Sequence, residues 1–203
     1  METAIQTVSG IDVLPWLDAV AALRIEVFRD FPYLYDGELD YERRYLSTYA
    51  QSPSSLFVLA LDGERVVGAS TGLPLADADP EFQTPFIEQG ISVDSVFYFG
   101  ESVLQRAYRG QQLGHRFFDV REQFATALGK TVTAFCAVER PEKHPLRPQD
   151  YTTLERFWQQ RGYSKQTAMQ TCYEWRDIGE PDPTDKPMIF WVKDSNKTHR
   201  NST

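Results

Sequence analysis

Apolar positions in the first quarter of the chain follow helical spacing. Behind Pro15, apolar residues and one arginine recur every three or four positions: Leu17, Val20, Ala21, Arg24, Val27 and Phe28. This spacing predicts a helix that ends before Pro32, and residues 31–37 are expected to form a loop. A second helix is predicted over residues 39–50. Its tyrosines at four-residue spacing are interpreted as a stripe facing the core: Tyr41, Tyr45 and Tyr49.

Short β-prone runs follow in the middle of the chain. Residues 56–61 and 65–73 flank Asp62-Gly63, a dipeptide that favours a hairpin turn. Residues 77–89 are acidic and contain two prolines, so we expect a long excursion that includes one helical turn. Connections of this length are often lids or binding loops. Residues 93–104 are again typical of a strand.

The second half of the chain alternates helices with strands. We predict helices over 117–128 and 150–162, strands over 131–138, 168–175 and 188–192, and a proline-rich loop over 140–150. Gly129 and Gly162 stand where helix C-caps belong. With hairpins at both ends, this order predicts an α/β (α+β) sandwich with a mixed sheet. We expect one domain over residues 1–193 and a disordered tail over 194–203.

Composition and charge narrow the classes of partner. The formal net charge is -8 and the sequence pI is about 4.9, so nucleic acid is not an expected partner. No stretch is long and apolar enough to span a bilayer, and the first residues do not resemble a signal peptide. We therefore expect a cytoplasmic protein without a membrane partner. The two cysteines and three histidines have no metal-ligand spacing, so no metal is expected.

Residues 108–115 connect a predicted strand to a predicted helix and contain Gly110 and Gly114. A glycine-bearing turn at a helix N-terminus exposes several backbone N–H groups, and the helix dipole adds positive potential there. Arg109 adds a cation. This arrangement suits a phosphate group. Taken alone, however, two glycines favour an ordinary tight turn.

In its context this stretch resembles the acetyl-CoA signature of the GNAT N-acetyltransferase superfamily, Gln/Arg-x-x-Gly-x-Gly/Ala. Arg109 matches the first position and Gly114 the last. Gln112 replaces the middle glycine, and the N–H donors survive that change if φ stays negative there. Element order over residues 14–175, and motifs within 97–163, resemble a bacterial branch of this superfamily.

The resemblance implies a mixed, mostly antiparallel central sheet flanked by helices. It also implies acetyl-CoA (coenzyme A) as co-substrate, held by Val103, Leu104, Arg109, Gly110, Gln111, Gln112, Leu113, Gly114, His115, Tyr151 and Trp158.

A second stretch, residues 158–163, resembles the family's Tyr-x-x-x-Gly-Phe. Typical members carry, at the position of Trp158, a tyrosine that protonates the departing thiolate. An indole N–H donates hydrogen bonds but is not a usable acid. Tyr151 stands where many members have an asparagine. The acid for the thiolate is therefore left unassigned.

Acyl transfer to an amine needs a group that takes the amine proton and a donor for the carbonyl oxygen. The resemblance implies Glu101 as the base, Glu139 as a second candidate and the Leu104 N–H as the donor. A structural carboxylate is an equal alternative for Glu101. Tyr33 and Tyr35 lie where the family admits acceptors, and their rings suit either a bound cation or core packing.

The predicted function is transfer of an acetyl group from acetyl-CoA to a primary amine of a small molecule. One alternative is a degenerate acyl-CoA-binding domain without turnover, which Gln112 and Trp158 favour. Another is a protein N-acetyltransferase, which needs an open groove, whereas residues 77–89 and 140–150 suggest a covered site. The expected partner is a small-molecule amine, and a homodimer is left open.

Overall fold

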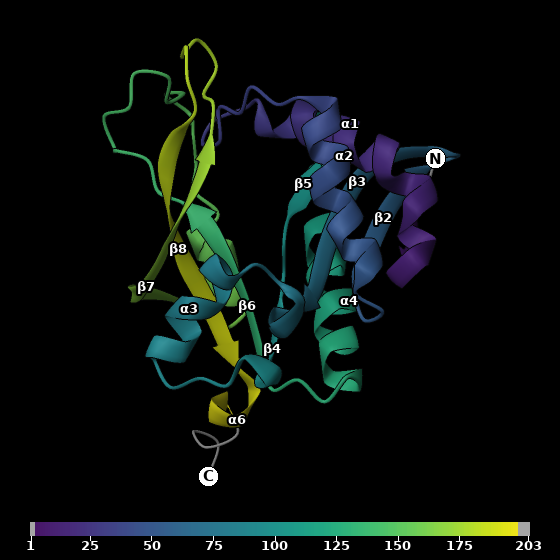
Figure 1. Cartoon of the computed structure of the whole chain (residues 1–203). Helices are drawn as coiled ribbons and strands as arrows, with labels where there is room; N and C mark the ends of the chain where they lie inside the picture. The colour runs from purple at the N-terminus through teal and green to yellow at the C-terminus, as the bar shows by residue number, and fades with distance from the viewer. Residues whose placement is uncertain (1–2, 199–203) are drawn as a thin grey trace.

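The computed structural model describes residues 3–198 and shows a central sheet with helices on both faces (Figure 1). The strands are β1 (Ala4–Val8), β2 (Leu56–Asp62), β3 (Arg65–Pro74), β4 (Val96–Tyr98), β5 (Ser102–Leu104), β6 (Val132–Val138), β7 (Ser164–Trp175) and β8 (Thr184–Asp194). The α-helices are α1 (Leu17–Phe28), α2 (Leu39–Ser47), α3 (Pro80–Glu88), α4 (Leu113–Ala127), α5 (Glu155–Gln160) and α6 (Ser195–Thr198). The 3-10 turns are η1 (Gly10–Trp16), η2 (Thr48–Gln51), η3 (Leu75–Asp77), η4 (Val93–Ser95) and η5 (Arg106–Tyr108).

The strands within residues 3–198 form one eight-stranded sheet in the order β1-β2-β3-β4-β6-β8-β7, and β5 also pairs with β3. Neighbouring strands are antiparallel except β4 and β6, which are parallel. The predicted mixed, mostly antiparallel sheet is confirmed. The edge strand β1 was not predicted, because its residues are mainly exposed and show no apolar alternation.

Alternation along the strands builds a core on each face of the sheet. Phe57 and Leu59 of β2 pack in one core with residues of α1, α2 and α3, whereas Leu56 and Val58 pack in the other with residues of α4. All four side chains are at most 1% exposed. Successive side chains of a strand point to opposite faces, so the continuous apolar run 56–61 is the expected pattern for a strand buried on both sides.

Several predicted boundaries need correction. The excursion at 77–89 contains a nine-residue helix, α3, that begins with Pro80 at its first position, where the missing N–H has no cost. Helix α5 begins at Glu155 rather than at residue 150, where the sequence predicted its start. The predicted tail begins too early, because Asp194 still pairs with Val132 in the sheet and α6 follows it. Residues 199–203 of that tail lie outside the described residues.

The tyrosines of the second helix do not form a core stripe. The buried residues of α2 are Glu42 and Leu46, while Tyr41 is 39% exposed. Only Tyr49, in the turn η2, lies fully in the core among these three tyrosines. A wholly buried glutamate on this helix requires a partner, and it directs attention to the space between α1, α2 and the sheet.

The sheet opens in its middle, where β4 and β5 part. The parallel pairing of β4 with β6 ends at Tyr98 and Ala134, and the Phe99 N–H donates to the Ala134 carbonyl over 2.8 Å. Beyond this point β5 pairs with β3 alone, while β6 continues to Val138 beside β8. Figure 1 shows β5 and β6 diverging from the end of β4.

Candidate active site

A one-residue bulge separates β4 from β5. The pairing register with β3 shifts by one residue between Tyr98 and Ser102. Bulges of this kind bend a strand and turn a side chain toward a new direction, and they are common beside active sites. Here the turned residue is Glu101, whose side chain lines a cavity on the α1 and α2 side of the sheet.

Two neighbours hold the bulge in place. Gly100 has no room for a side chain, because a Cβ there would lie 2.1 Å from the Tyr49 hydroxyl and 2.6 Å from Thr71 Oγ1. The buried guanidinium of Arg121 in α4 donates from Nη1 to the carbonyls of Thr71 (3.2 Å) and Glu101 (3.1 Å). Each carbonyl also accepts from the backbone across the bulge, Thr71 C=O from the Gly100 N–H and Glu101 C=O from the Thr71 N–H, so Arg121 adds a second donor that fixes both strands at this point.

The two diverging strands present backbone polar groups to the gap between them. Hydrogen bonds to β3 use the N–H of Gln105 and the C=O of Glu101, so strand alternation points the polar groups of Leu104 away from β3, toward β6. On β6, Ala134 bonds toward β4, and the same alternation points Cys136 and Val138 into the gap. An extended ligand with amide groups can hydrogen-bond to such edges as an added strand would.

The segment after β5 has the backbone geometry that the predicted anion site requires. Gly110 and Gln112 have φ of 78° and 62°, and α4 begins directly after them. Within residues 3–198, the N–H groups of residues 110–115 donate to no protein acceptor. Free N–H donors at the start of a fifteen-residue helix form a site for phosphate oxygens.

Gln112 departs from the condition set by the sequence argument. Retention of the N–H donors was expected only if φ stayed negative there, and the structure instead has the left-handed conformation that glycine adopts without strain. The N–H donors remain available even so. The glutamine therefore costs conformational energy at the position where the resembling family has its middle glycine.

The other predicted cofactor residues divide into two groups. Arg109 lies beside the gap, where its Nε donates to the Leu104 carbonyl over 3.2 Å and its Nη2 lies 3.8 Å from Asp30. The His115 ring packs against Phe157 in α5 at 4.8 Å. The neighbouring Gln111 is exposed, Leu113 is buried, and Gly114 meets only Phe157.

Three predicted residues have packing contacts instead of groups directed into the gap. Val103 is fully buried, and alternation directs its polar groups to β3, so it has no group to offer a cofactor. Trp158 packs between Phe135 and Trp191, with ring centroids at 5.0 and 5.1 Å. Tyr151 packs edge-on against Phe31 at 4.7 Å.

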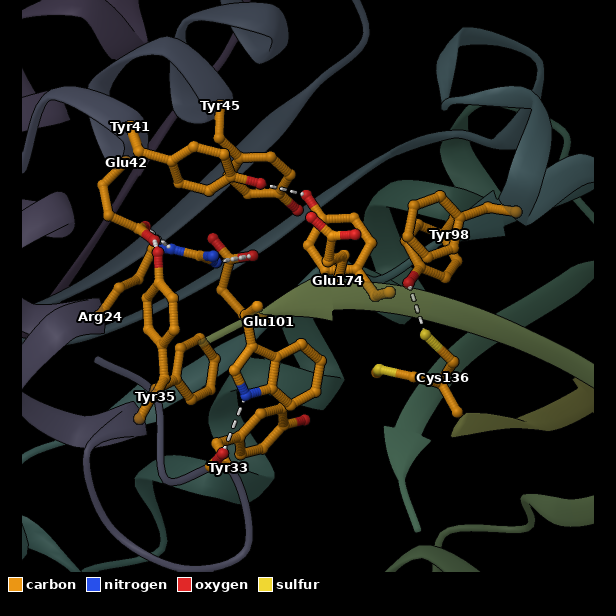
Figure 2. Close-up of a pocket in the computed structure, with 16 residues that line it drawn as sticks. Arg24, Tyr33, Tyr35, Tyr41, Glu42, Tyr45, Tyr98, Glu101, Cys136 and Glu174 are labelled. Atoms are coloured by element: carbon orange, nitrogen blue, oxygen red, sulfur yellow. Dashed lines mark hydrogen bonds and ion pairs between the residues drawn. The ribbon is translucent and has the colours of Figure 1, made fainter. Parts of the chain in front are cut away.

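On the opposite side of the bulge lies a cavity of about 80 Å³ that is walled mainly by aromatic rings (Figure 2). It is enclosed by residues from α1, the loop before α2, α2, α3, the bulge and the strands β4, β6, β7 and β8. Its lining includes Phe28, Tyr33, Tyr35, Tyr41, Tyr45, Phe82, Tyr98, Tyr173 and Trp175. The predicted acceptor residues Tyr33, Tyr35 and Glu101 thus meet in one place.

A charged cluster forms the floor of this cavity. Arg24 of α1 lies between two carboxylates: it forms a short ion pair with Glu42 of α2, and its Nη1 lies 2.5 Å from Glu101 Oε2. Glu101 Oε2 is thus engaged by the Arg24 guanidinium, whereas no hydrogen bond reaches Glu101 Oε1. The side chain of Glu101 is only 2% exposed.

Burial raises the pKa of Glu101, the nearby Arg24 charge opposes this shift, and the Glu42 charge adds to it. The result is a carboxylate that is costly to ionise and has an oxygen free to accept a proton or a hydrogen bond. Such properties occur both in catalytic carboxylates and in buried ion-pair clusters.

Glu139, the second predicted catalytic carboxylate, does not join this cluster. It is exposed and lies 2.5 Å from Lys165 Nζ, outside the residues that line the cavity. Conversely, sequence reasoning did not identify Arg24 and Glu42 as site residues. The signal was present, because both charges fall on the apolar spacing of their helices, where a charge must be paired.

Residues 3–198 contain neither a membrane-spanning helix nor a cluster of metal-binding side chains. No helix there has the length and hydropathy that crossing a membrane requires. The same residues contain no group of three or more His, Cys, Asp or Glu side chains placed to bind a metal ion.

Comparison with known proteins identifies the fold of this protein through solved structures alone. No protein-family model matches the sequence, and no curated protein matches it. Solved structures do match. The GNAT-family acetyltransferase from Streptococcus pneumoniae has a TM-score of 0.56 at 13% identity, covering 95% of this chain and 98% of that one. Ribosomal-protein-alanine N-acetyltransferase from Brucella melitensis has a TM-score of 0.61 at 11% identity, covering 94% and 99%.

A structure from Salmonella typhimurium that contains its cofactor acetyl-CoA has a TM-score of 0.61 at 10% identity, covering 96% of this chain and 95% of that one. The matches extend over nearly the whole of both chains, so they concern the complete architecture rather than one motif. The protein therefore has the fold of the GNAT acetyltransferases.

Proposed function

We propose that this protein is an acetyl-CoA-dependent N-acetyltransferase that acts on a primary amine of a small molecule. The observation that carries the proposal is the position of Glu101. Its side chain points into the aromatic cavity, while the next residues of the same strand border the gap between β5 and β6. A donor held in the gap and an acceptor held in the cavity would meet at the bulge.

The described residues fit coenzyme A on two counts. The unpaired N–H groups of residues 110–115 suit a pyrophosphate. The polar edges of Leu104 and Cys136 suit the two amides of a pantetheine arm. When bound, acetyl-CoA supplies the acetyl thioester. The Leu104 N–H, directed to the gap, is the donor that we assign to the thioester carbonyl.

Glu101 is the group that we assign to the amine proton. The amine nitrogen forms the new C–N bond to the acetyl carbon as the C–S bond breaks, the amine proton passes to Glu101, and CoA leaves as its thiolate. A raised carboxyl pKa brings the base closer to the operating pH, where general bases work best. A thiol with a pKa of about 8.5 leaves readily as a thiolate, so the chemistry proceeds without the tyrosine that Trp158 replaces.

The alternative functions use the same fold. A protein N-acetyltransferase needs access for a peptide, whereas this cavity is small and enclosed by rings from six elements. The Brucella melitensis structure carries the name of a protein acetyltransferase, so peptides belong in the test. A binding domain without turnover is favoured only by Gln112 and Trp158, and Gln112 leaves the anion site intact.

The test is release of free CoA thiol from acetyl-CoA in the presence of a panel of primary amines, with the N-acetyl product identified by mass spectrometry. We expect amine-dependent thiol release with at least one member of the panel. CoA binding by calorimetry without release for any amine or peptide would support the binding domain. Release with peptides alone would support the protein acetyltransferase. Either result would overturn the proposal.

A further inference from the structure

The cavity has a chemical character that narrows the class of acceptor. We infer that it selects a primary alkylammonium ion carried on an apolar body, and that it disfavours a second charge. This inference rests on the proposed function for its biological meaning, but the binding site itself can be tested without any acetyl transfer.

The first observation is the unsatisfied carboxylate. Glu101 is 6% exposed and lines the cavity; its Oε2 lies against the Arg24 guanidinium, and no hydrogen bond reaches its Oε1. A buried carboxylate oxygen without a donor costs free energy unless a ligand supplies one. An ammonium group supplies both the charge and the N–H donors.

The second observation is that several neighbouring hydroxyl groups are already occupied. The Tyr35 hydroxyl donates to Glu42 Oε1 over 2.7 Å. The hydroxyls of Tyr41 and Tyr173 bond to each other at 2.9 Å. Figure 2 draws both bonds among the residues that line the cavity, with Glu101 beside Arg24. The walls therefore offer a ligand mainly ring carbon, which suits an apolar body.

The third observation concerns charge. The lining contains one cation, Arg24, and three carboxylates, Glu42, Glu101 and Glu174. One positive charge cannot balance them, so a cationic ligand is attracted. Arg24 itself lies over the rings of Phe28 and Tyr45, at 5.1 and 4.6 Å from their centroids. The Arg24 guanidinium thus already occupies two of the aromatic faces.

A second cationic group on the ligand would meet rings rather than a buried carboxylate. Glu174 is exposed, so its charge is screened by water and adds little to binding. A diamine would have to desolvate its distal charge against the walls. The structure therefore favours a monoamine over a diamine of equal chain length.

The experiment measures equilibrium binding by calorimetry, with and without saturating CoA, which carries no acetyl group. The probes are 2-phenylethylamine and its neutral counterpart 2-phenylethanol, followed by n-butylamine and putrescine. We expect each monoamine to bind at least about tenfold more tightly than its comparator, because buried charge-assisted pairs and desolvated charges contribute at this level.

Two variants locate the effect. E101Q should abolish the preference for 2-phenylethylamine over 2-phenylethanol while leaving 2-phenylethanol binding unchanged. E174Q, the matched loss of an exposed carboxylate from the same cavity, should change neither probe by more than about twofold. Circular dichroism and thermal melting confirm that both variants are folded.

The inference is overturned if 2-phenylethylamine binds in neither condition, if the alcohol binds equally well, if putrescine binds as tightly as n-butylamine, or if E101Q leaves the preference intact. Selective amine binding without acetyl transfer would support the ammonium site and contradict the proposed acetyltransferase activity. Acetyl transfer without a preference for the amine would support that activity and contradict the ammonium site.

Discussion

Replacing Arg24 with methionine leaves two buried carboxylates, Glu42 and Glu101, without the cation that both contact. Methionine keeps most of the volume and the apolar stem but removes the charge. The structure makes the expected cost large, because the side chains of the two carboxylates are 0% and 2% exposed and water cannot replace the lost partner.

Breaking a buried ion pair from one side typically costs about 3–5 kcal/mol. For a protein of about 200 residues, each kcal/mol lowers Tm by about 2–4 °C, so R24M should lower Tm by about 6–20 °C at pH 8. Denaturant unfolding at 25 °C measures the same loss directly as a change in the free energy of unfolding.

The pH dependence follows from the sign of the Glu101 shift. Burial raises the Glu101 pKa, and Arg24 is the main charge that opposes the rise. In R24M the folded-state pKa therefore increases further above the unfolded value. The folded variant then binds a proton that the unfolded chain releases, so its stability rises as pH falls toward the unfolded pKa. The difference between R24M and the parent should shrink from pH 8 to pH 5.

The matched control is R43M. Arg43 lies on α2 and, like Arg24, contacts two carboxylates, Asp18 and Asp40, but all three side chains are exposed. Solvent screens these pairs, so R43M should cost a small fraction of the R24M loss and show little dependence on pH. An R24M loss that is no larger than that of R43M, or equal at pH 5 and pH 8, would refute the account of the buried cluster.

Three further substitutions test the bulge, the turn and the predicted cofactor wall. G100A should destabilise by about 1–3 kcal/mol and reduce turnover, because its Cβ would overlap the Tyr49 hydroxyl; unchanged unfolding and activity would reject the close approach. Q112G should stabilise by about 0.5–1 kcal/mol in denaturant unfolding, since relief of left-handed strain exceeds the added unfolded-state entropy; destabilisation would show that the glutamine side chain has a contact of its own. W158F should keep most activity, as expected of a packing residue; a large loss of turnover with intact CoA binding would give its N–H a specific role.

Local patterns in the sequence predicted much of the fold. Apolar spacing predicted α1 over its observed range, and Gly63 and Gly129 have the positive φ that the hairpin turn and the helix C-cap require. The phosphate turn was predicted at residues 108–115 because its features are local: a strand, two glycines and a helix start. The strand β1 and the helix α3 were missed, because an exposed edge strand and a proline-bearing helix lack those patterns.

The site itself was predicted only in part. Glu101, Tyr33 and Tyr35 were named as candidates, but their meeting with Arg24 and Glu42 depends on three elements that are distant in the sequence. The bulge that turns Glu101 into the cavity is a property of pairing with β3, which no run of residues encodes alone. The role of Glu101 as base remains a prediction.

The pH–rate profile of acetyl transfer, measured for E101Q beside the parent, tests that prediction most directly. Glutamine keeps the shape of the side chain and removes its basicity. We predict a loss of about a hundredfold to ten-thousandfold in turnover near neutral pH, with little change in affinity for acetyl-CoA. The loss should shrink as pH rises, because more of the amine is then already neutral. A loss that stays parallel at every pH, or no loss at all, would contradict the assignment of Glu101 as the group that accepts the amine proton.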